Sequence, residues 1–365
     1  MSPRAGSSTV YVGQIDHQYV RRTVDILRHR YPNLTIEPTG GLWQPSRTAG
    51  RVVLHLQWID PALGQSSPFG AAKSAFLLSF YVIALRLTGV RTVWTIHNPV
   101  GKGHNRRTLD RVLRTALAAT CSQFVVLNAG AATVTEADLY PPVRRRFRRR
   151  VHTVPMPMTI NTHGVEMSTG EARTRLGINS TMKPVLTYLT GHNHPDRSGD
   201  LRDPMGRYEL ISLQRDGHGD IAPGLHRVSG GWEFRGRPSD EEYGLLVSSG
   251  DAVVLAADRA FGSLTLHNAV ELRRPVISLA CPAAEELAVL GGAIQIEGDV
   301  SSDKIAAAWE QIDLESAHTA FEVFERRHND THVANALGGA YQAAGLELGE
   351  PVMQNSQAEG DTPYG

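Results

Sequence analysis

The sequence predicts an α/β protein of two doubly wound, Rossmann-like domains that face a central cleft. Short apolar runs alternate with longer helical patterns, which is typical of parallel sheets covered by helices. The length of 365 residues corresponds to about two domains. The charge balance also changes along the chain, from 21 basic and 7 acidic residues in 1–160 to 16 basic and 30 acidic residues in the remainder.

The composition is that of a globular protein with a sizeable core, with 41% hydrophobic and 20% charged residues. The surplus of basic residues in 1–160 predicts that the first domain meets an anionic partner. Cys121 and Cys281 are the only cysteines, too few for a disulfide framework or a cysteine-based metal site. The N-terminus shows no signal-peptide pattern, so we expect a cytoplasmic protein.

Residues 1–160 are expected to form an N-terminal Rossmann-like domain. The predicted strands are Thr9–Val12, Val52–Leu56, Thr92–Ile96, Phe124–Leu127 and Val151–Val154. The predicted helices are His17–Arg30, Ala71–Leu87, Leu109–Ala119 and Ala131–Asp138. The apolar stretch 75–85 is too short to span a bilayer. We expect its helix to lie in the core, with a membrane role secondary.

After a proline-containing linker that starts at Pro155, residues 170–316 are expected to form a second Rossmann-like domain. Its predicted strands are Val185–Leu189, Arg207–Leu213, Trp232–Arg235, Ala252–Ala256, Val276–Leu279 and Ala293–Ile296. Its predicted helices are Glu171–Leu176, Asp240–Ser248, Ser263–Leu272, Ala283–Leu290 and Ser302–Leu314. A helical region, 317–348, is expected to cross back to the first domain. A tail, 349–365, is expected to be disordered.

The most informative segment is VWTIHNPVGKGHNRR, residues 93–107. It places His97 and Asn98 at the carboxyl end of a central strand, where open α/β sheets bind ligands. The alternative interpretation is that His97 caps the strand and bonds the backbone. The segment LHLQWID, 54–60, provides a second strand that ends in polar and aromatic residues near the same edge.

A turn at Gly262 followed by a helix capped by Ser263 is the candidate phosphate site. Unpaired N–H groups at a helix N-terminus suit a phosphate group, although any capped helix shares this pattern.

Together these segments resemble the GT-B nucleotide-sugar glycosyltransferases of the group-1 or family-4-like kind. The likeness is greatest to bacterial exopolysaccharide and glycolipid glycosyltransferases with a W-T-x-H-N segment. LHLQWID resembles their H-x-H-W strand end, and 236–278 resembles their donor-binding half. GHNHPDRS, 191–198, is similar to their phosphate turn, with Arg197 at the position of a lysine.

The sequence departs from this family at two acidic positions. Family-4 enzymes often carry a glutamate on each side of a Phe-Gly turn, whereas Arg259 and approximately Asn268 occupy these positions here. The departure leaves open that the chain is a catalytically inactive GT-B-like protein that binds a sugar or nucleotide.

The resemblance implies a hexosyltransferase that needs no metal and no cofactor besides its donor substrate. It makes 1–160 the acceptor-side domain and 170–316 the nucleotide-sugar-binding domain. The donor would be a nucleotide diphosphate sugar, with GDP-mannose as one candidate. The acceptor would be a lipid-linked saccharide or polysaccharide precursor at the cytoplasmic face of the membrane. The expected donor-binding residues are Gly191, Arg197, Arg235, Gly262, Ser263 and Asn268.

His97 is expected to face the transferred sugar or the acceptor. An inverting mechanism would need a general base near the acceptor hydroxyl. Asp16, His17 and His104 are candidates for this base, and the sequence does not choose among them.

The run Arg144–Arg150 holds six arginines around Phe147. Such a run is either a solvated surface or a contact with anionic lipids, which would be electrostatic and would need no inserted helix. A nucleic-acid binder is the third hypothesis. No known nucleic-acid module accompanies the run, so no nucleic-acid partner is expected.

Overall fold

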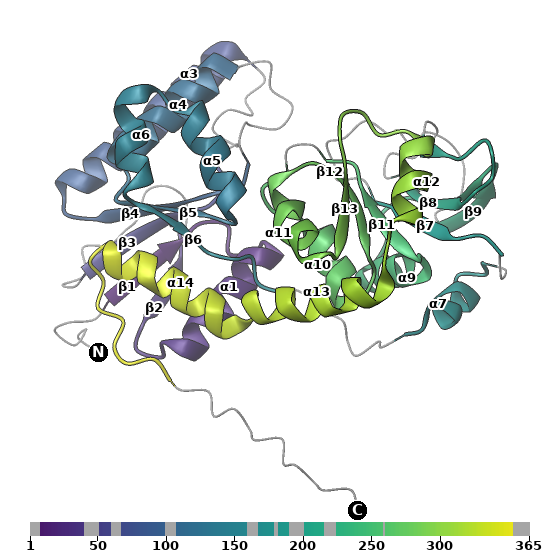
Figure 1. The fold of residues 1–365 in the computed structure, drawn as a ribbon. Helices are drawn as coiled ribbons and strands as arrows, with labels where there is room; N and C mark the ends of the chain where they lie inside the picture. Colours follow the sequence, from purple (N-terminus) through teal and green to yellow (C-terminus); the bar gives the residue numbers. More distant parts are fainter. Residues whose placement is uncertain are drawn as a thin grey trace, which may run out of the picture.

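The computed structural model describes residues 8–39, 51–59, 67–98, 107–158, 167–178, 182–189, 201–214, 224–257 and 260–352. Within these ranges the chain forms two sheets, each with helices packed on both faces (Figure 1). The predicted fold class, two doubly wound α/β domains, is confirmed.

The first sheet has six parallel strands in the order β2-β1-β3-β4-β5-β6. Its winding reverses between β1 and β3, so the carboxyl ends of these two strands flank the switch point where open sheets hold ligands. The strands are β1 (Ser8–Val12), β2 (Thr35–Pro38), β3 (Arg51–Leu56), β4 (Arg91–Ile96), β5 (Gln123–Val126) and β6 (Val151–Thr153).

Four helices cover one face of this sheet, and α1 covers part of the other (Figure 1). Alternation along the strands sends Val10 and Val53 to the α1 face and Tyr11 and Leu54 to the opposite face. The helices are α1 (Gln18–Arg30), α3 (Pro68–Leu87), α4 (Arg107–Thr120), α5 (Ala129–Asp138) and α6 (Pro141–Arg148).

The second sheet has the order β13-β12-β11-β7-β8-β10-β9, with only β9 antiparallel to its neighbour. Its winding reverses between β7 and β11, which places a second switch point at their carboxyl ends. The strands are β7 (Val185–Tyr188), β8 (Glu209–Gln214), β9 (Gly224–Val228), β10 (Gly231–Arg235), β11 (Ala252–Leu255), β12 (Val276–Leu279) and β13 (Ala293–Ile296).

Helices α9, α10, α11 and α13 supply one core of the second domain, and α12 packs on the opposite face. Ser239 caps α9 in a reciprocal capping box with Glu242, and Gly291 ends α11 in the left-handed conformation. The helices are α7 (Thr169–Arg175), α9 (Asp240–Ser249), α10 (Leu264–Glu271), α11 (Pro282–Leu290), α12 (Ser302–Glu310) and α13 (Leu314–Arg327).

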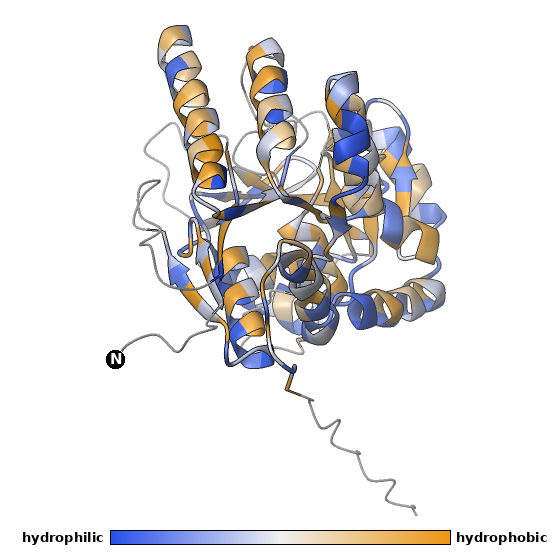
Figure 2. Ribbon diagram, turned by 90° about the vertical axis from the view of Figure 1, so that its left-hand side faces the viewer, coloured by the Kyte–Doolittle hydropathy of each residue, from blue (hydrophilic) through white to orange (hydrophobic). Residues whose placement is uncertain are grey.

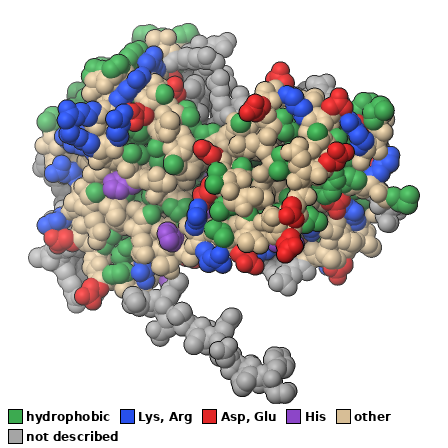
Figure 3. Space-filling view, in the orientation of Figure 1, with side chains coloured by type: hydrophobic (Ala, Val, Ile, Leu, Met, Phe, Trp, Pro, Cys, Tyr) green, Lys and Arg blue, Asp and Glu red, His purple; other side chains and the backbone are tan. Residues whose placement is uncertain are grey.

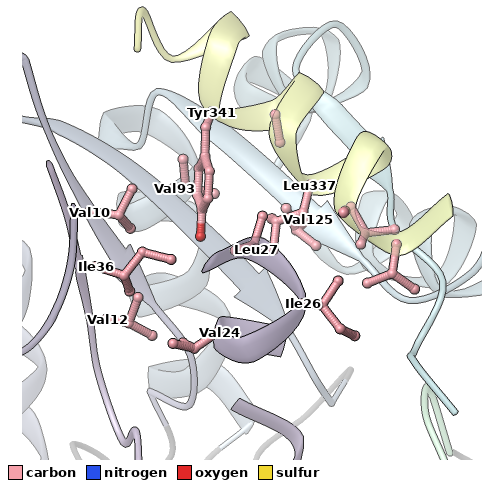
Figure 4. Packing of buried hydrophobic residues seen from close by; sticks show 14 of the residues in the cluster. Val10, Val12, Val24, Ile26, Leu27, Ile36, Val93, Val125, Leu337 and Tyr341 are labelled. Carbon is pink, nitrogen blue, oxygen red and sulfur yellow. The ribbon is translucent and has the colours of Figure 1, made fainter. Parts of the chain in front are cut away.

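The last helix, α14 (Asp330–Ala343), returns to the first domain. It packs against α1, β5 and β6 and covers the part of the sheet that α1 leaves open (Figure 1). Leu337 and Tyr341 lie in the same buried cluster as Val93, Val125 and Leu27 (Figure 4). The C-terminal helix therefore belongs to the core of the N-terminal domain.

The predicted strands are all present, and three differences have physical causes. Strands β2 and β9 were not predicted, because both lie at sheet edges, where one face or both stay exposed and the apolar alternation is weak. The arginine run forms helix α6, anchored by buried Val143 and Phe147. The C-terminal helical region is two helices, which meet where Asn329 caps α14.

The expectation that Ala71–Leu87 lies in the core is wrong for half of the helix. Helix α3 starts at Pro68, after the cap Ser67, and only 33% of its most apolar window is buried. Among the described helices it alone is long and apolar enough, by length and composition, to cross a membrane. Sequence hydrophobicity does not reveal which side of such a helix finds a partner.

Two adjacent glycines on α14 allow a test of its packing. A Cβ on Gly338 would lie 2.6 Å from the Tyr31 hydroxyl oxygen and 3.0 Å from its ring, whereas a Cβ on Gly339 would meet nothing within 4 Å. We expect Gly338→Ala to lower the free energy of unfolding by about 1 kcal/mol or more through overpacking. Gly339→Ala should raise it by about 0.5–1 kcal/mol, the usual helix preference for alanine. Urea unfolding measures both, and equal effects would contradict this packing.

Candidate functional site

Five side chains gather at the carboxyl edge of the first sheet, beside its switch point. We call this group the His97 cluster, and it comprises His17, Tyr19, Gln57, Trp58 and His97. The Trp58 ring stacks on the His97 ring, with centroids 4.0 Å apart and planes at 12°. His17 contacts Trp58 with ring centroids 4.3 Å apart, and the Tyr19 ring meets His97 edge-on. The structure thus joins the predicted His97 to the predicted LHLQWID strand end.

The hydrogen bonds of the cluster assign the proton on each imidazole. His97 Nε2 lies 2.9 Å from Gln57 Oε1 and must donate to it, because a carbonyl oxygen only accepts. His97 Nδ1 then carries the lone pair, and no described residue hydrogen-bonds it. His17 Nδ1 accepts the Tyr19 backbone N–H at 3.3 Å, so the proton of its neutral ring sits on Nε2. The side-chain bond of His97 differs from the backbone cap that was the alternative interpretation.

A buried polar layer beneath the cluster holds Gln57 in place. His55 Nε2 lies 2.7 Å from Thr95 Oγ1, and His55 Nδ1 lies 2.7 Å from the Tyr341 hydroxyl of α14. The Gln57 amide nitrogen lies 3.3 Å from His55 Nε2, so its Oε1 is turned to His97. His55 and Gln57 were not predicted as site residues. The available signal was two polar residues, two positions apart, in an otherwise apolar strand.

The histidines of this edge are neutral at pH 7. Burial lowers the pKa of His55 to about 3. Burial, followed by the neighbouring imidazoles of His55 and His17, holds the pKa of His97 well below its ordinary value of 6.5. Burial also lowers the pKa of His17. His97 Nδ1 can therefore accept a hydrogen bond from a hydroxyl group at neutral pH.

The other predicted bases are placed differently. The Asp16 side chain is exposed next to the cluster residue His17, and its backbone carbonyl accepts from Arg21. His104 lies outside the described residues. Of the two predicted bases that the structure describes, His17 is the one whose ring contacts Trp58.

The predicted phosphate site lies at the N-terminus of α10, after strand β11 at the switch point of the second sheet. Ser263 caps the helix, with its hydroxyl accepting the Leu266 N–H at 3.2 Å. The first turn of α10 holds no acidic residue, so the positive end of its dipole is not neutralised there. Helix α9 differs, because three acidic residues occupy its first turn and would repel a phosphate. Of these two helices, α10 is the one suited to an anion.

The turn before α10 touches the first domain directly. A Cβ on Gly262 would lie 2.5 Å from Leu127 Cδ1 and 3.3 Å from Met156 Sδ, so this position needs glycine. The preceding Phe261 is fully buried within the core of the first domain. Leu264 packs against the same buried cluster as Trp58. The α10 N-terminus therefore lies in direct contact with the first domain, whose sheet carries the His97 cluster at its carboxyl edge.

The remaining predicted donor residues do not gather at this point. Arg235 ends β10, three strands away from β11, and pairs with Glu233 at 2.6 Å. Asn268 lies in the second turn of α10, half-buried. Gly191, Arg197 and Arg259 lie outside the described residues. Within the described part of the chain, no group of three His, Cys, Asp or Glu residues could hold a metal ion.

No family model matches the sequence, and no curated protein sequence matches it. Solved structures match its fold. HepE of Anabaena, in complex with UDP, is 14% identical with a TM-score of 0.60, and the match covers 92% of this chain and all of HepE. WaaG, a glycosyltransferase involved in lipopolysaccharide biosynthesis, is 12% identical with a TM-score of 0.54, covering 92% and 98% of the two chains.

A glycosyltransferase of Rickettsia africae is 8% identical with a TM-score of 0.55, covering 94% of this chain and all of that one. Identities this low show the fold alone. The chain has the GT-B fold that these proteins share.

The buried histidines predict a loss of stability in acid. Burial lowers the pKa of His55, and burial followed by His328 lowers that of His267, each to about 3. Below about pH 6.5 these histidines bind protons in the unfolded chain and stay neutral in the folded chain. The free energy of unfolding therefore falls by about 1.4 kcal/mol for each histidine with every unit of decreasing pH. This loss should continue towards pH 3 and be absent above pH 6.5.

Urea unfolding between pH 7 and pH 4 measures the slope. Whatever its stability at pH 7, His55→Asn should lose less unfolding free energy per pH unit than the natural protein. The expected difference is that of one bound proton, about 1.4 kcal/mol per pH unit. Gln342→Ala, at an exposed position without a titratable group, should keep the slope of the natural protein. An unchanged slope in His55→Asn would mean that His55 is protonated in the folded state.

Proposed function

We propose that this protein is a glycosyltransferase that moves a sugar from a nucleotide diphosphate sugar to an acceptor bound by the first domain. The observation that carries the proposal is that, within a GT-B fold, the capped α10 N-terminus touches the first domain, whose sheet carries the His97 cluster at its carboxyl edge. One side offers positive helix-end potential, and the other offers a neutral imidazole with an unprotonated nitrogen. Sugar transfer needs both, since a diphosphate departs while a hydroxyl attacks.

The α10 N-terminus would stabilise the departing diphosphate. Its first N–H groups have no partner within the helix, and its dipole favours negative charge. Arg197 would add a positive charge, so the reaction would need no bound metal. HepE has been solved with UDP and with UDP-glucose, which makes a UDP-sugar our first candidate for the donor. GDP-mannose is the competing candidate.

His97 would hydrogen-bond a hydroxyl of the transferred sugar or of the acceptor through Nδ1. The stack with Trp58 and the bond to Gln57 hold the His97 ring in one orientation, so the ring is already positioned before the reaction begins. The acceptor would be a lipid-linked saccharide or a polysaccharide precursor, met at the cytoplasmic face of the membrane. The surplus of basic residues in 1–160 supports an anionic carrier.

A second candidate function is binding without catalysis. Arg259 and Asn268 stand at or near the positions where family-4 enzymes often carry glutamates. A protein of this kind would bind the nucleotide sugar and neither transfer nor hydrolyse it.

Titration calorimetry of the full chain with UDP and GDP tests donor binding. We expect heat from one of the two, with a dissociation constant below about 1 mM. Release of the nucleoside diphosphate from the matching sugar nucleotide would then distinguish an enzyme from a binding protein. If neither nucleotide binds at millimolar concentration, the proposal fails.

His97→Ala should slow transfer by about 100-fold, since loss of the group that positions a reacting hydroxyl can cost about 10²-fold in rate. Nucleotide affinity should not change, because the α10 site lies in the other domain. The exposed His332→Ala is the matched control and should transfer at the natural rate. A lower melting temperature with unchanged transfer would assign His97 a structural role only.

A further inference from the structure

Helix α3 buries one side and leaves an apolar stripe on the other, with the exposed Lys73 between its first two members. We call this stripe the α3 stripe. Its side chains follow one another at intervals of seven, four, three and four residues, which keeps them on one side of a helix. They are Phe69, Phe76, Phe80, Ile83 and Leu87, with exposed fractions of 80%, 70%, 60%, 41% and 84%.

The opposite side of α3 is fixed in the domain. Its buried residues pack with strands β1, β3 and β4 and with helix α4, and they are Ala71, Ala75, Leu78, Tyr81, Val82 and Leu85. The helix cannot cross a bilayer without leaving this core. Its stripe, about 27 Å long at 1.5 Å per residue, can only lie flat against a partner.

An exposed apolar surface of this extent is typical of a protein interface or a membrane contact. Figure 2 shows α3 as the helix with the most continuous hydrophobic colouring of those that rise from the first sheet. The charged residues of the 20-residue helix are Lys73, in its second turn, and Arg86, in its last turn, and the helix holds no acidic residue. The charge around the stripe is therefore of one sign.

Neighbouring helices extend this basic border. Helix α4 packs beside α3 and exposes Arg111, and α6 packs beside α4 and exposes Arg145 and Arg149. Figure 3 shows Lys and Arg side chains gathered over the part of the first domain where Figure 1 places α6. An apolar stripe bordered by cations is complementary to acyl chains beneath anionic headgroups. Pairing with a second copy would instead bring cations from both helices together without an anion.

We propose that α3 lies along an anionic lipid bilayer, with the α3 stripe at the boundary between headgroups and acyl chains. The exposed arginines of α4 and α6 contact the lipid phosphates. The contact is thus mainly apolar, which replaces the purely electrostatic attachment expected from the arginine run. This membrane contact involves a surface separate from the α10 site. Because its test uses neither donor nor acceptor, the outcome does not depend on whether the protein transfers a sugar.

Co-sedimentation of the full chain with vesicles of phosphatidylglycerol and phosphatidylcholine tests the proposal. The variant Phe76→Ser/Phe80→Ser should bind at least about tenfold more weakly, because two exposed rings no longer enter the bilayer. Val289→Ser removes an equally exposed apolar side chain, 83% exposed, from α11 of the second domain and should bind normally. All three proteins should melt at similar temperatures, since these side chains lie outside the core.

Salt separates apolar from electrostatic attachment. The natural protein should stay largely bound at about 1 M salt, where the Debye length is about 3 Å. Arg145→Gln/Arg149→Gln should weaken binding at about 0.1 M salt only, and less than the phenylalanine variant does. Complete release by salt, or full binding of the phenylalanine variant, would overturn the proposal.

A fluorescent label places the stripe directly. Cys121 and Cys281 are the only cysteines and are both buried, so Phe80→Cys introduces a selectively labelled thiol. An environment-sensitive dye there should shift to the blue with vesicles and be quenched by nitroxide lipids, whereas a dye on Val289→Cys should not respond. No shift at position 80, or a concentration-dependent dimer in sedimentation that Phe76→Ser/Phe80→Ser abolishes, would assign the stripe to another partner.

Discussion

The architecture depends on covering the second face of the first sheet. Three of its crossover connections place their helices on one face, and α1 alone cannot cover the other. Helix α14 fills this gap with Leu337 and Tyr341, more than 300 residues after the first strand of the sheet. The Tyr341 hydroxyl bonds His55 in the middle of the sheet, so the C-terminal helix is joined to the strand that leads into Trp58.

The chain passes between the two domains twice, and we call each passage a crossing. The first crossing contains Met156 and Met158, and the second is the α13–α14 junction at His328, where the chain returns to the first domain. The two crossings bond each other, because His328 Nδ1 lies 2.8 Å from the Met156 carbonyl oxygen and the Met158 N–H donates to the His328 carbonyl. His328 also reaches Glu286 of α11 and His267 of α10. The helix proposed to hold the diphosphate is therefore attached at the point where both crossings meet.

Sequence patterns revealed most of this fold because the central strands are buried on both faces and therefore apolar. They also revealed His97 and Ser263, since strand ends and helix caps are local features. The patterns could not reveal Tyr341 as a partner of His55, because that contact joins elements 286 positions apart. Arg235 was expected among the donor-binding residues from the resemblance, whereas the order of the strands separates it from β11. The sequence also did not show that one side of α3 is exposed, since apolar side chains in a core and on a surface give the same sequence pattern.

The α3 stripe and the His97 cluster share one edge of the molecule. Strands β3 and β4 are parallel, so the helix that connects them runs in the opposite direction and begins at their carboxyl ends. Phe69, at the start of the stripe, thus lies at the edge that carries Trp58 and His97. A bilayer along the stripe would meet the domain beside the proposed acceptor site. The saccharide of a lipid-linked acceptor could then reach the site while its lipid stays in the membrane, because only the headgroup has to contact the His97 cluster.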